Sequence, residues 1–261
     1  MTTVPAPTTD VGSNPLADFL VKHKYTFRRL HSLTGILFGG YLVFHLLINA
    51  TLLEGGRGGV GPTVYQQQVD KIHGLPWLFA LSWFAILLPI IYHTLYGILV
   101  IAAGRPNMGS YRYAKNWYYF LQRVSAIILI GFIAFHVLGF KGLLPGTLGE
   151  NLTFVPRDYA TESTIRHMQA AFWVGWIIYP LGILAATFHL ANGFWAGGIT
   201  WGLTVSRKGQ NRWGAVCIGI FLVTTACGFG ALGATLLADK PVIPVEQDRD
   251  AYLEKYDAVG D

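Results

Sequence analysis

The stretch GYLVFH at residues 40–45 places a histidine near the far end of a long apolar run. A matching stretch, GFIAFH, occupies residues 131–136 and repeats the order of glycine, aromatic, two aliphatics, phenylalanine and histidine. Two further histidines in apolar surroundings lie in YHTLYG at 92–97 and FHLANG at 188–193, and each is followed four positions later by a glycine. Four histidines in two matched pairs indicate a shared purpose.

The composition indicates a membrane protein. Of the 261 residues, 52% are hydrophobic and 13% are charged, whereas an ordinary soluble domain has about 25% charged residues. The apolar residues gather in runs that exceed the roughly 20 residues needed to cross a hydrocarbon layer, and none of these runs contains Asp or Glu. Segments with turn-forming residues separate them. The predicted spans cover residues 29–53, 75–103, 117–141, 168–198 and 212–237.

We therefore predict an all-α integral membrane protein with five transmembrane helices, the first four of which form a four-helix bundle. Its orientation follows from Lys and Arg, because 11 of these 19 residues fall on the side of the N-terminus and basic residues favour the cytoplasm. The N-terminus is thus predicted inside and the C-terminus outside. The predicted parts are a cytoplasmic segment 1–28, a membrane domain 29–237 and a polar, acidic outer tail 238–261.

The depths of the four histidines follow from this orientation. At 1.5 Å per residue, His45 and His136 lie about 12 and 9 Å before the outer ends of helices 1 and 3. His93 and His189 lie about 24 and 30 Å inward from the outer ends of helices 2 and 4. We call His45 and His136 the outer pair, and His93 and His189 the inner pair. Helix 1 is diagonal to helix 3, and helix 2 to helix 4, in an up-down bundle, so the members of each pair should face each other.

Two facing imidazoles with a flat gap between them are typical of bis-histidine haem ligation. Gly40, Gly131, Gly97 and Gly193 lie about one turn from the histidines and would leave room for a planar macrocycle against the backbone. The absence of a Cys-x-x-Cys-His stretch argues against covalent attachment. We therefore predict two non-covalent haem b groups, with the outer pair as axial iron ligands of one and the inner pair of the other.

Histidines and glycines in membrane helices often have simpler roles. A lone intramembrane histidine is more often a packing or proton-relay residue than a haem ligand, and glycines are common close-packing points. Four histidines at two matched depths nevertheless favour haem ligation. His23, His73 and His167 lie near span ends and are expected to be interfacial polar residues. For His31 two interpretations are about equally good: an interfacial polar residue, or a residue that contacts a haem propionate. The candidates for propionate contact are His31, Ser32, Arg29 and Trp117.

Four stretches in order, FRRLHSLTG (27–35), PIIYHTLYG (89–97), NWYYFLQRVSAI (116–127) and FHLANGFWAGGITWGLTV (188–205), resemble the cytochrome b558 membrane anchor of succinate:menaquinone oxidoreductases. The resemblance covers roughly residues 25 to 235. It implies a five-helix di-haem anchor in the bacterial cytoplasmic membrane, carrying an FAD-containing flavoprotein and an iron–sulfur subunit on its cytoplasmic face. It also implies the same ligand pairs, with electrons passing from succinate through the partner subunits, the inner haem and the outer haem to menaquinone.

The resemblance further implies a quinone pocket near the outer haem, bordered by the segment 61–77. The candidate polar partners there are Gln66, Asp70 and His73. Related di-haem fumarate reductases have a glutamate two residues before the helix-4 histidine, used in a proton path. That position is Thr187 here, so this path is not expected.

Two rival functions stay open at this point. The chain could be the di-haem anchor of another membrane dehydrogenase, such as a formate dehydrogenase or a hydrogenase, which the co-purifying subunits would reveal. It could also be a haem-free transporter that uses its histidines as proton relays, which a reduced-minus-oxidised spectrum would reveal. No nucleophile-and-base arrangement is apparent, so the chain alone is expected to catalyse nothing.

Overall fold

The computed structural model describes residues 19, 22–55, 64–104, 108–109, 112–156 and 159–239. All regular secondary structure in this described part is helical, as predicted. The helices are α2 (Lys24–Ala50), η1 (Thr51–Gly55), α3 (Val64–His73), α4 (Leu78–Leu81), η2 (Ser82–Leu87), α5 (Leu88–Ala102), α6 (Ala114–Phe140), α7 (Gly146–Leu152), α8 (Ala160–Gln169), η3 (Val174–Ile178), α9 (Tyr179–Thr200) and α10 (Arg207–Leu236).

Within the described residues, five helical segments are long and apolar enough to cross a membrane, and the chain is an all-α integral membrane protein. The five segments are Lys24–Leu53, Leu78–Ala102, Ala114–Phe140, Val174–Thr200 and Arg207–Leu236. Their ends lie within six residues of those of the predicted spans, and the largest difference is at the start of the fourth. That span begins at Val174 rather than residue 168 because Met168 and Gln169 end the separate helix α8. The tail after residue 239 and most of the segment before residue 22 lie outside the described residues.

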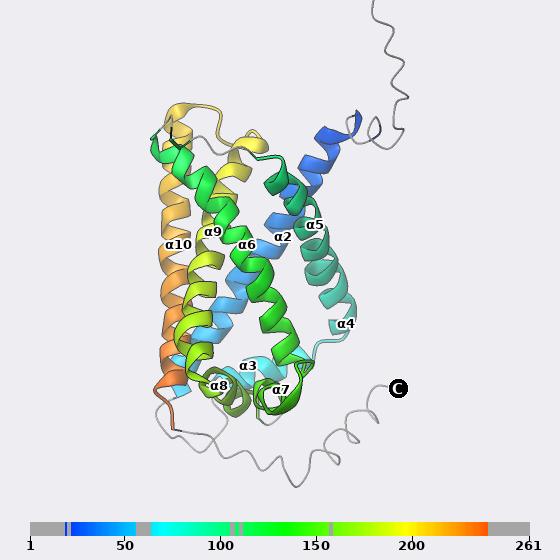
Figure 1. Cartoon of the computed structure of the whole chain (residues 1–261), viewed down its shortest axis with the longest axis vertical. Coiled ribbons are helices and arrows are strands. Elements are labelled where there is room, and N and C mark those ends of the chain that lie inside the picture. The colour runs from blue at the N-terminus through cyan, green and yellow to red at the C-terminus, as the bar shows by residue number, and fades with distance from the viewer. Residues whose placement is uncertain are drawn as a thin grey trace, which may run out of the picture.

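The long helices form a bundle with one helix added at its side (Figure 1). Helix α2 packs against α5 and α9, and α6 packs against α9 and, more loosely, α5. The backbones of α2 and α6, and those of α5 and α9, are not close neighbours along their described lengths, which is the diagonal arrangement expected of an up-down bundle. Helix α10 packs outside this group, against α9 and α2.

Two membrane helices begin in the same way, with a π-helical turn followed by a proline. The π segment Ser82–Leu87 precedes Pro89, and Val174–Ile178 precedes Pro180. Proline has no backbone N–H and its ring crowds the carbonyl four residues earlier, and a widened turn accommodates that break in the helical ladder. Both breaks are close to the end of the bundle that carries α3, α7 and α8.

Three short helices, α3, α7 and α8, close one end of the bundle (Figure 1). Gln66 on α3 is buried and its amide oxygen accepts a hydrogen bond from the backbone N–H of Ala160, the first residue of α8 (2.6 Å). An apolar cluster joins α7 and α8 to α9 and α10, and consists of Leu152, Met168, Val174, Tyr179, Ile183 and Leu232. We call α3, α7 and α8 the cap. The cap is therefore packed onto the bundle and is not a loose connection.

The contact between α6 and α9 depends on Gly182. A Cβ atom at this position would overlap the ring of Phe132, and that ring is itself held against His136 and Tyr179 at centroid distances of 5.9 and 5.4 Å.

We expect Gly182→Ala to destabilise the protein by about 1–3 kcal/mol, as overpacking does, measured as a lower Tm of the purified protein in detergent. Gly219→Ala is the control, because a Cβ atom there meets nothing within 4 Å. Equal Tm values for the two variants would contradict the expectation.

Candidate functional site

The structure brings the four histidines together in the two predicted pairs. The ring centroids of His45 and His136 are 5.9 Å apart, and those of His93 and His189 are 6.2 Å apart. The two rings of each pair are nearly perpendicular, at 83° in both cases. Each pair links diagonal helices, α2 to α6 and α5 to α9, so the imidazoles meet across the bundle where the backbones do not.

This spacing would allow the two imidazoles of a pair to share a metal ion. A metal–imidazole bond is about 2 Å long, and a ring nitrogen lies about 1 Å from the ring centre, so two trans ligands have centroids about 6 Å apart. No cluster of three or more His, Cys, Asp or Glu side chains suited to a metal ion is found among the described residues. Each pair can therefore supply two axial donors, and a planar macrocycle would have to supply the others.

The inner histidine His93 presents the correct nitrogen for such a role. Its Nδ1 lies 3.0 Å from the backbone carbonyl oxygen of His31. A carbonyl can only accept, so Nδ1 carries the proton and Nε2 keeps its lone pair. The ring of His31 is stacked on that of His93, with 4.0 Å between centroids and 14° between planes. This stacking fixes the plane of the imidazole as well as its tautomer.

His189, the other inner histidine, is oriented by a serine. The Ser125 hydroxyl donates to the carbonyl oxygen of Gln122 (3.1 Å) and lies 3.2 Å from Nδ1 of His189. Because the hydroxyl has one proton, its oxygen accepts from Nδ1 of His189, and Nε2 is again left free. The Gln122 amide donates to the carbonyl oxygen of His189 (3.2 Å) and accepts from Asn192 (2.7 Å). Hydrogen bonds to the second ring nitrogen are how proteins orient metal-binding histidines.

The outer histidines are held differently from each other. Nδ1 of His136 lies 2.9 Å from the hydroxyl oxygen of Tyr179, a group that can either donate or accept. The Asn49 amide, one turn beyond His45 on the same helix, donates to the carbonyl oxygen of His45 (2.7 Å) and lies 3.3 Å from its Nε2. An amide N–H that approaches Nε2 requires a lone pair there. A metal at this site would have to take that lone pair from Asn49.

The predicted glycines near the histidines have room for a Cβ atom. A Cβ atom on Gly40 or Gly131 would meet nothing within 4 Å, and on Gly97 or Gly193 only side-chain atoms at 3.5 and 3.7 Å. A fifth glycine, Gly35, is tighter, since a Cβ there would lie 2.6 Å from Cε1 of His93. This residue was not among the predicted ones, and it allows the inner imidazole to approach α2.

The two pairs lie at separate levels of the bundle. His93 is level with Gly35 on α2, and His45 is ten residues further along that helix, which corresponds to about 15 Å. His189 is level with Ser125 on α6, and His136 is eleven residues further along, which corresponds to about 16 Å. Two helices thus give the same separation independently.

The candidates for propionate contact are only partly brought together. Nδ1 of His31 is buried and has no hydrogen-bond partner. The Ser32 hydroxyl accepts from the Trp201 indole (3.0 Å), and the Arg29 guanidinium lies 4.5 Å from the centre of a Trp201 ring. Trp117 is on a different helix, α6, where it is 47% exposed and packs edge-on against Phe120.

A further cation, Arg123, lies near the level of the inner pair and has a nitrogen without a hydrogen-bond partner. Its Nε is buried without a hydrogen-bond partner, while its guanidinium lies 3.5 Å from the centre of the Tyr119 ring. Arg123 precedes Ser125, the partner of His189, by two residues on α6. In the sequence it stands out only as a basic residue near a helix end. A buried guanidinium nitrogen without a partner is a donor available to an anionic group.

The quinone candidates all lie on α3, in the cap. Gln66 donates to Asp70 (2.8 Å) and to the carbonyl oxygen of Pro156 (3.0 Å), besides accepting from Ala160. Nδ1 of His73 lies 3.0 Å from the carbonyl oxygen of Val69. Gln66 thus ties α3 to the start of α8, and a role of these side chains in quinone binding stays a prediction.

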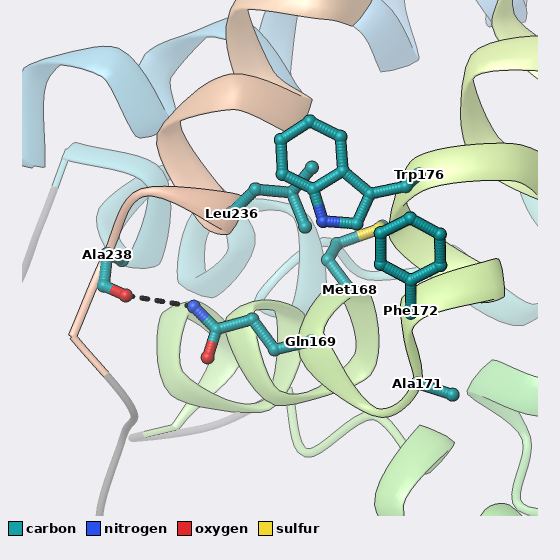
Figure 2. Close-up of a pocket in the computed structure, with 7 residues that line it drawn as sticks. All are labelled: Met168, Gln169, Ala171, Phe172, Trp176, Leu236 and Ala238. Atoms are coloured by element: carbon teal, nitrogen blue, oxygen red, sulfur yellow. Dashed lines mark hydrogen bonds between the residues drawn. The ribbon is translucent and has the colours of Figure 1, made fainter.

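A surface pocket of about 270 Å³ lies elsewhere, between α8, η3 and α10 (Figure 2). The Gln169 amide at its edge donates to the carbonyl oxygens of Thr235 (2.8 Å) and Ala238 (2.9 Å). It shares no residue with the quinone candidates; its lining residues are Met168, Gln169, Ala171, Phe172, Trp176, Leu236 and Ala238.

His167 is not the interfacial residue that was expected. Its side chain is 0% exposed, because α8 folds underneath the bundle instead of continuing into the fourth span. Nδ1 lies 2.7 Å from the carbonyl oxygen of Leu152, and Nε2 lies 2.8 Å from the hydroxyl oxygen of Tyr179. Burial lowers the pKa of His167 to about 4, so the imidazole is neutral at pH 7.

The residues that hold the histidines were not predicted from the sequence; they are Asn49, Gln122, Ser125, His167 and Tyr179. Asn49 could have been found from its spacing of four residues from His45, which places both on one helix face. Ser125 and Gln122 are polar residues inside an apolar span, which is itself a signal of function. Tyr179 and His167 depend on how α8 folds back, and no local pattern reveals that.

The fold and the site define a class: five-helix membrane proteins whose bundle holds two diagonal histidine pairs, with ring centroids 5.9 and 6.2 Å apart. No protein-family model matches the chain. A comparison with curated proteins finds 31% identity over 212 residues with the succinate dehydrogenase cytochrome b558 subunit of Bacillus subtilis (strain 168), covering 81% of this chain and 96% of that protein. The chain belongs to the succinate dehydrogenase cytochrome b558 subunit family.

Gln66 allows a test of the cap that does not depend on any cofactor. We expect Gln66→Leu to lower the stability by about 1–3 kcal/mol, since the buried backbone N–H of Ala160 and carbonyl of Pro156 lose their partner. The measurement is the Tm of the purified protein without added quinone. Lys71→Gln, at an exposed position of the same helix, is the control and should keep the Tm. An unchanged Tm for Gln66→Leu would mean that this hydrogen-bond network does not hold α3 to α8.

Proposed function

We propose that this chain is the di-haem b membrane anchor of a succinate dehydrogenase, connecting an iron–sulfur subunit to menaquinone in the membrane. The spacing of the histidine pairs carries the proposal, because 5.9 and 6.2 Å between ring centroids suit two axial ligands of one iron ion. The family name of the relative, a b-type cytochrome of succinate dehydrogenase, points to the same group and the same enzyme.

The chain's own residues prepare each site. His45 and His136 would hold the outer haem, and His93 and His189 the inner one. The Nδ1 hydrogen bonds of three of these histidines keep Nε2 free to coordinate. Haem iron, when bound, supplies reversible one-electron transfer. The apolar helices around the sites exclude water, which together with the axial ligands sets the reduction potential.

Polar groups at the inner level would receive the propionates of the inner haem. His31 and Arg123 each have a buried nitrogen without a partner, which an anionic carboxylate would satisfy. The Ser32 hydroxyl accepts from Trp201 and so retains its own proton to donate. Arg29 and Trp117 remain candidates for propionate contact, as predicted from the sequence.

The orientation and the partners complete the proposal. The N-terminus lies in the cytoplasm, and a flavoprotein with FAD and an iron–sulfur protein dock on that side, close to the inner haem. The cap then faces outward, and menaquinone binds near the outer haem with Gln66, Asp70 or His73 as polar partners. The distribution of Lys and Arg supports this direction.

The first test is the haem content of the complex purified through this subunit. We expect two haem b per chain in a pyridine haemochrome assay, together with a flavoprotein and an iron–sulfur protein in the same preparation. A haem-free preparation would favour a transporter with histidine relays. Two haems with the soluble subunits of another dehydrogenase would instead favour a different anchor.

The second test separates the pairs. We expect His93→Ala to remove or convert to high spin only the inner haem, and His136→Ala only the outer haem, because each loses one of two axial ligands. Low-temperature spectra and redox titrations of the two variants distinguish the haems. In the His136→Ala variant succinate oxidation with a soluble dye should continue while reduction of quinone stops. Loss of the same spectral component in both variants would overturn the assigned pairs.

A further inference from the structure

A chain of hydrogen bonds runs from the outer histidine His136 out of the bundle and into the cap. Nδ1 of His136 lies 2.9 Å from the Tyr179 hydroxyl oxygen, which lies 2.8 Å from Nε2 of His167. Nδ1 of His167 lies 2.7 Å from the carbonyl oxygen of Leu152, the last residue of α7. Three hydrogen bonds therefore connect one member of the outer pair to a helix of the cap.

We propose that Tyr179 and His167 are positioning residues that fix the proton of His136 on Nδ1 and thereby keep its Nε2 available to the iron of the outer haem. This inference rests on the proposed function, since it assigns a role to residues around that haem. It adds two side chains that touch no reacting atom and act only through His136.

The direction of every hydrogen bond in the chain follows from its last acceptor. The Leu152 carbonyl can only accept, so Nδ1 of His167 carries a proton. A neutral His167 then has its lone pair on Nε2 and accepts the proton of the Tyr179 hydroxyl. That hydroxyl has no second proton, so its oxygen accepts from Nδ1 of His136. With a neutral His167, the one arrangement consistent with all three distances leaves Nε2 of His136 unprotonated.

The opposite direction requires a charged His167. With protons on both nitrogens, His167 would donate to Tyr179, whose hydroxyl would then donate to Nδ1 of His136 and leave the proton on Nε2. The complete burial of His167 disfavours the cation. Burial is the largest influence on the pKa of His167 and lowers it, which outweighs the hydrogen bond to the Leu152 carbonyl that raises it. The neutral form and the first direction are therefore the stable ones.

Close packing also restricts the side chains of this hydrogen-bond chain. The Phe140 ring lies between the two histidines, with its centroid 4.1 Å from that of His167 and 4.7 Å from that of His136. Gly139, next to Phe140 on α6, leaves room for the His167 ring, because a Cβ atom there would lie 3.1 Å from Cε1. Side chains with so little room keep their rotamers, which is what a positioning role requires.

The test compares variants of His167 that differ in hydrogen-bond polarity. His167→Leu removes both bonds, whereas His167→Gln keeps one donor and one acceptor and can reproduce the same direction. Tyr179→Phe removes the hydroxyl, and Tyr65→Phe is its matched control, since Tyr65 is a buried tyrosine of the cap whose hydroxyl lies 3.3 Å from that of Thr164. All variants are made in the full complex, and the inner haem, read in the same spectrum, reports whether the bundle is folded.

The readouts are the midpoint potential of each haem and the transfer of haem to apomyoglobin. We expect Tyr179→Phe and His167→Leu to weaken retention of the outer haem on the order of 10- to 100-fold, as loss of residues that support metal ligands does, and to raise its potential, since Nδ1 of His136 loses an acceptor. His167→Gln and Tyr65→Phe should resemble the unmodified protein, and the inner haem should be unchanged throughout.

Two results would overturn the inference. One is an outer haem with unchanged potential and retention in both Tyr179→Phe and His167→Leu. The other is a defect in His167→Gln as large as in His167→Leu, which would mean that His167 acts by packing alone. Failure of the proposed function is visible separately, because the unmodified complex would then lack an outer haem before any variant is compared.

Discussion

An imidazole inside a bundle of apolar helices can bind a metal ion through one nitrogen only if the proton is held on the other, and the structure depends on that constraint. At His93, His189 and His136 the proton-holding group is a backbone carbonyl, a serine and a tyrosine respectively. The groups differ in chemistry but share one property: each has its own proton committed elsewhere or has none. The direction of the hydrogen bond at Nδ1 therefore decides which nitrogen is free, and the type of residue that accepts this hydrogen bond is less important.

The same constraint explains the close approach of particular helices. His93 on α5 reaches the carbonyl of His31 on α2 only because Gly35 presents no Cβ atom to its ring. His189 on α9 reaches Ser125 on α6, and α6 and α9 are brought together where Gly182 admits the ring of Phe132. Small residues allow membrane helices to pack closely, and here that packing brings an acceptor to Nδ1 of His93 and to Nδ1 of His189.

The elements that could be predicted from the sequence are those whose signal is local or periodic. The five apolar spans, the diagonal helices and the pairs His45–His136 and His93–His189 follow from segment length and depth alone, and the structure has them. His167 shows where such prediction fails. The run from Met168 onward is apolar and continuous in sequence, so the end of α8 at Gln169 is hidden. Only the tertiary fold of α8 beneath the bundle buries His167 and brings it to Tyr179.

The two levels of the bundle differ in what supports them. The inner histidines are held by groups on the adjacent membrane helices, the His31 carbonyl on α2 and Ser125 on α6, so that level is complete once the bundle has formed. The outer histidine His136 is held through Tyr179 and His167 by the end of α7, so its orientation depends on segments outside the membrane. If the outer pair holds a haem as proposed, the cap is part of that site. A disturbance of α7 or α8 would then reach His136 through three hydrogen bonds, whereas the inner histidines keep their partners on α2 and α6.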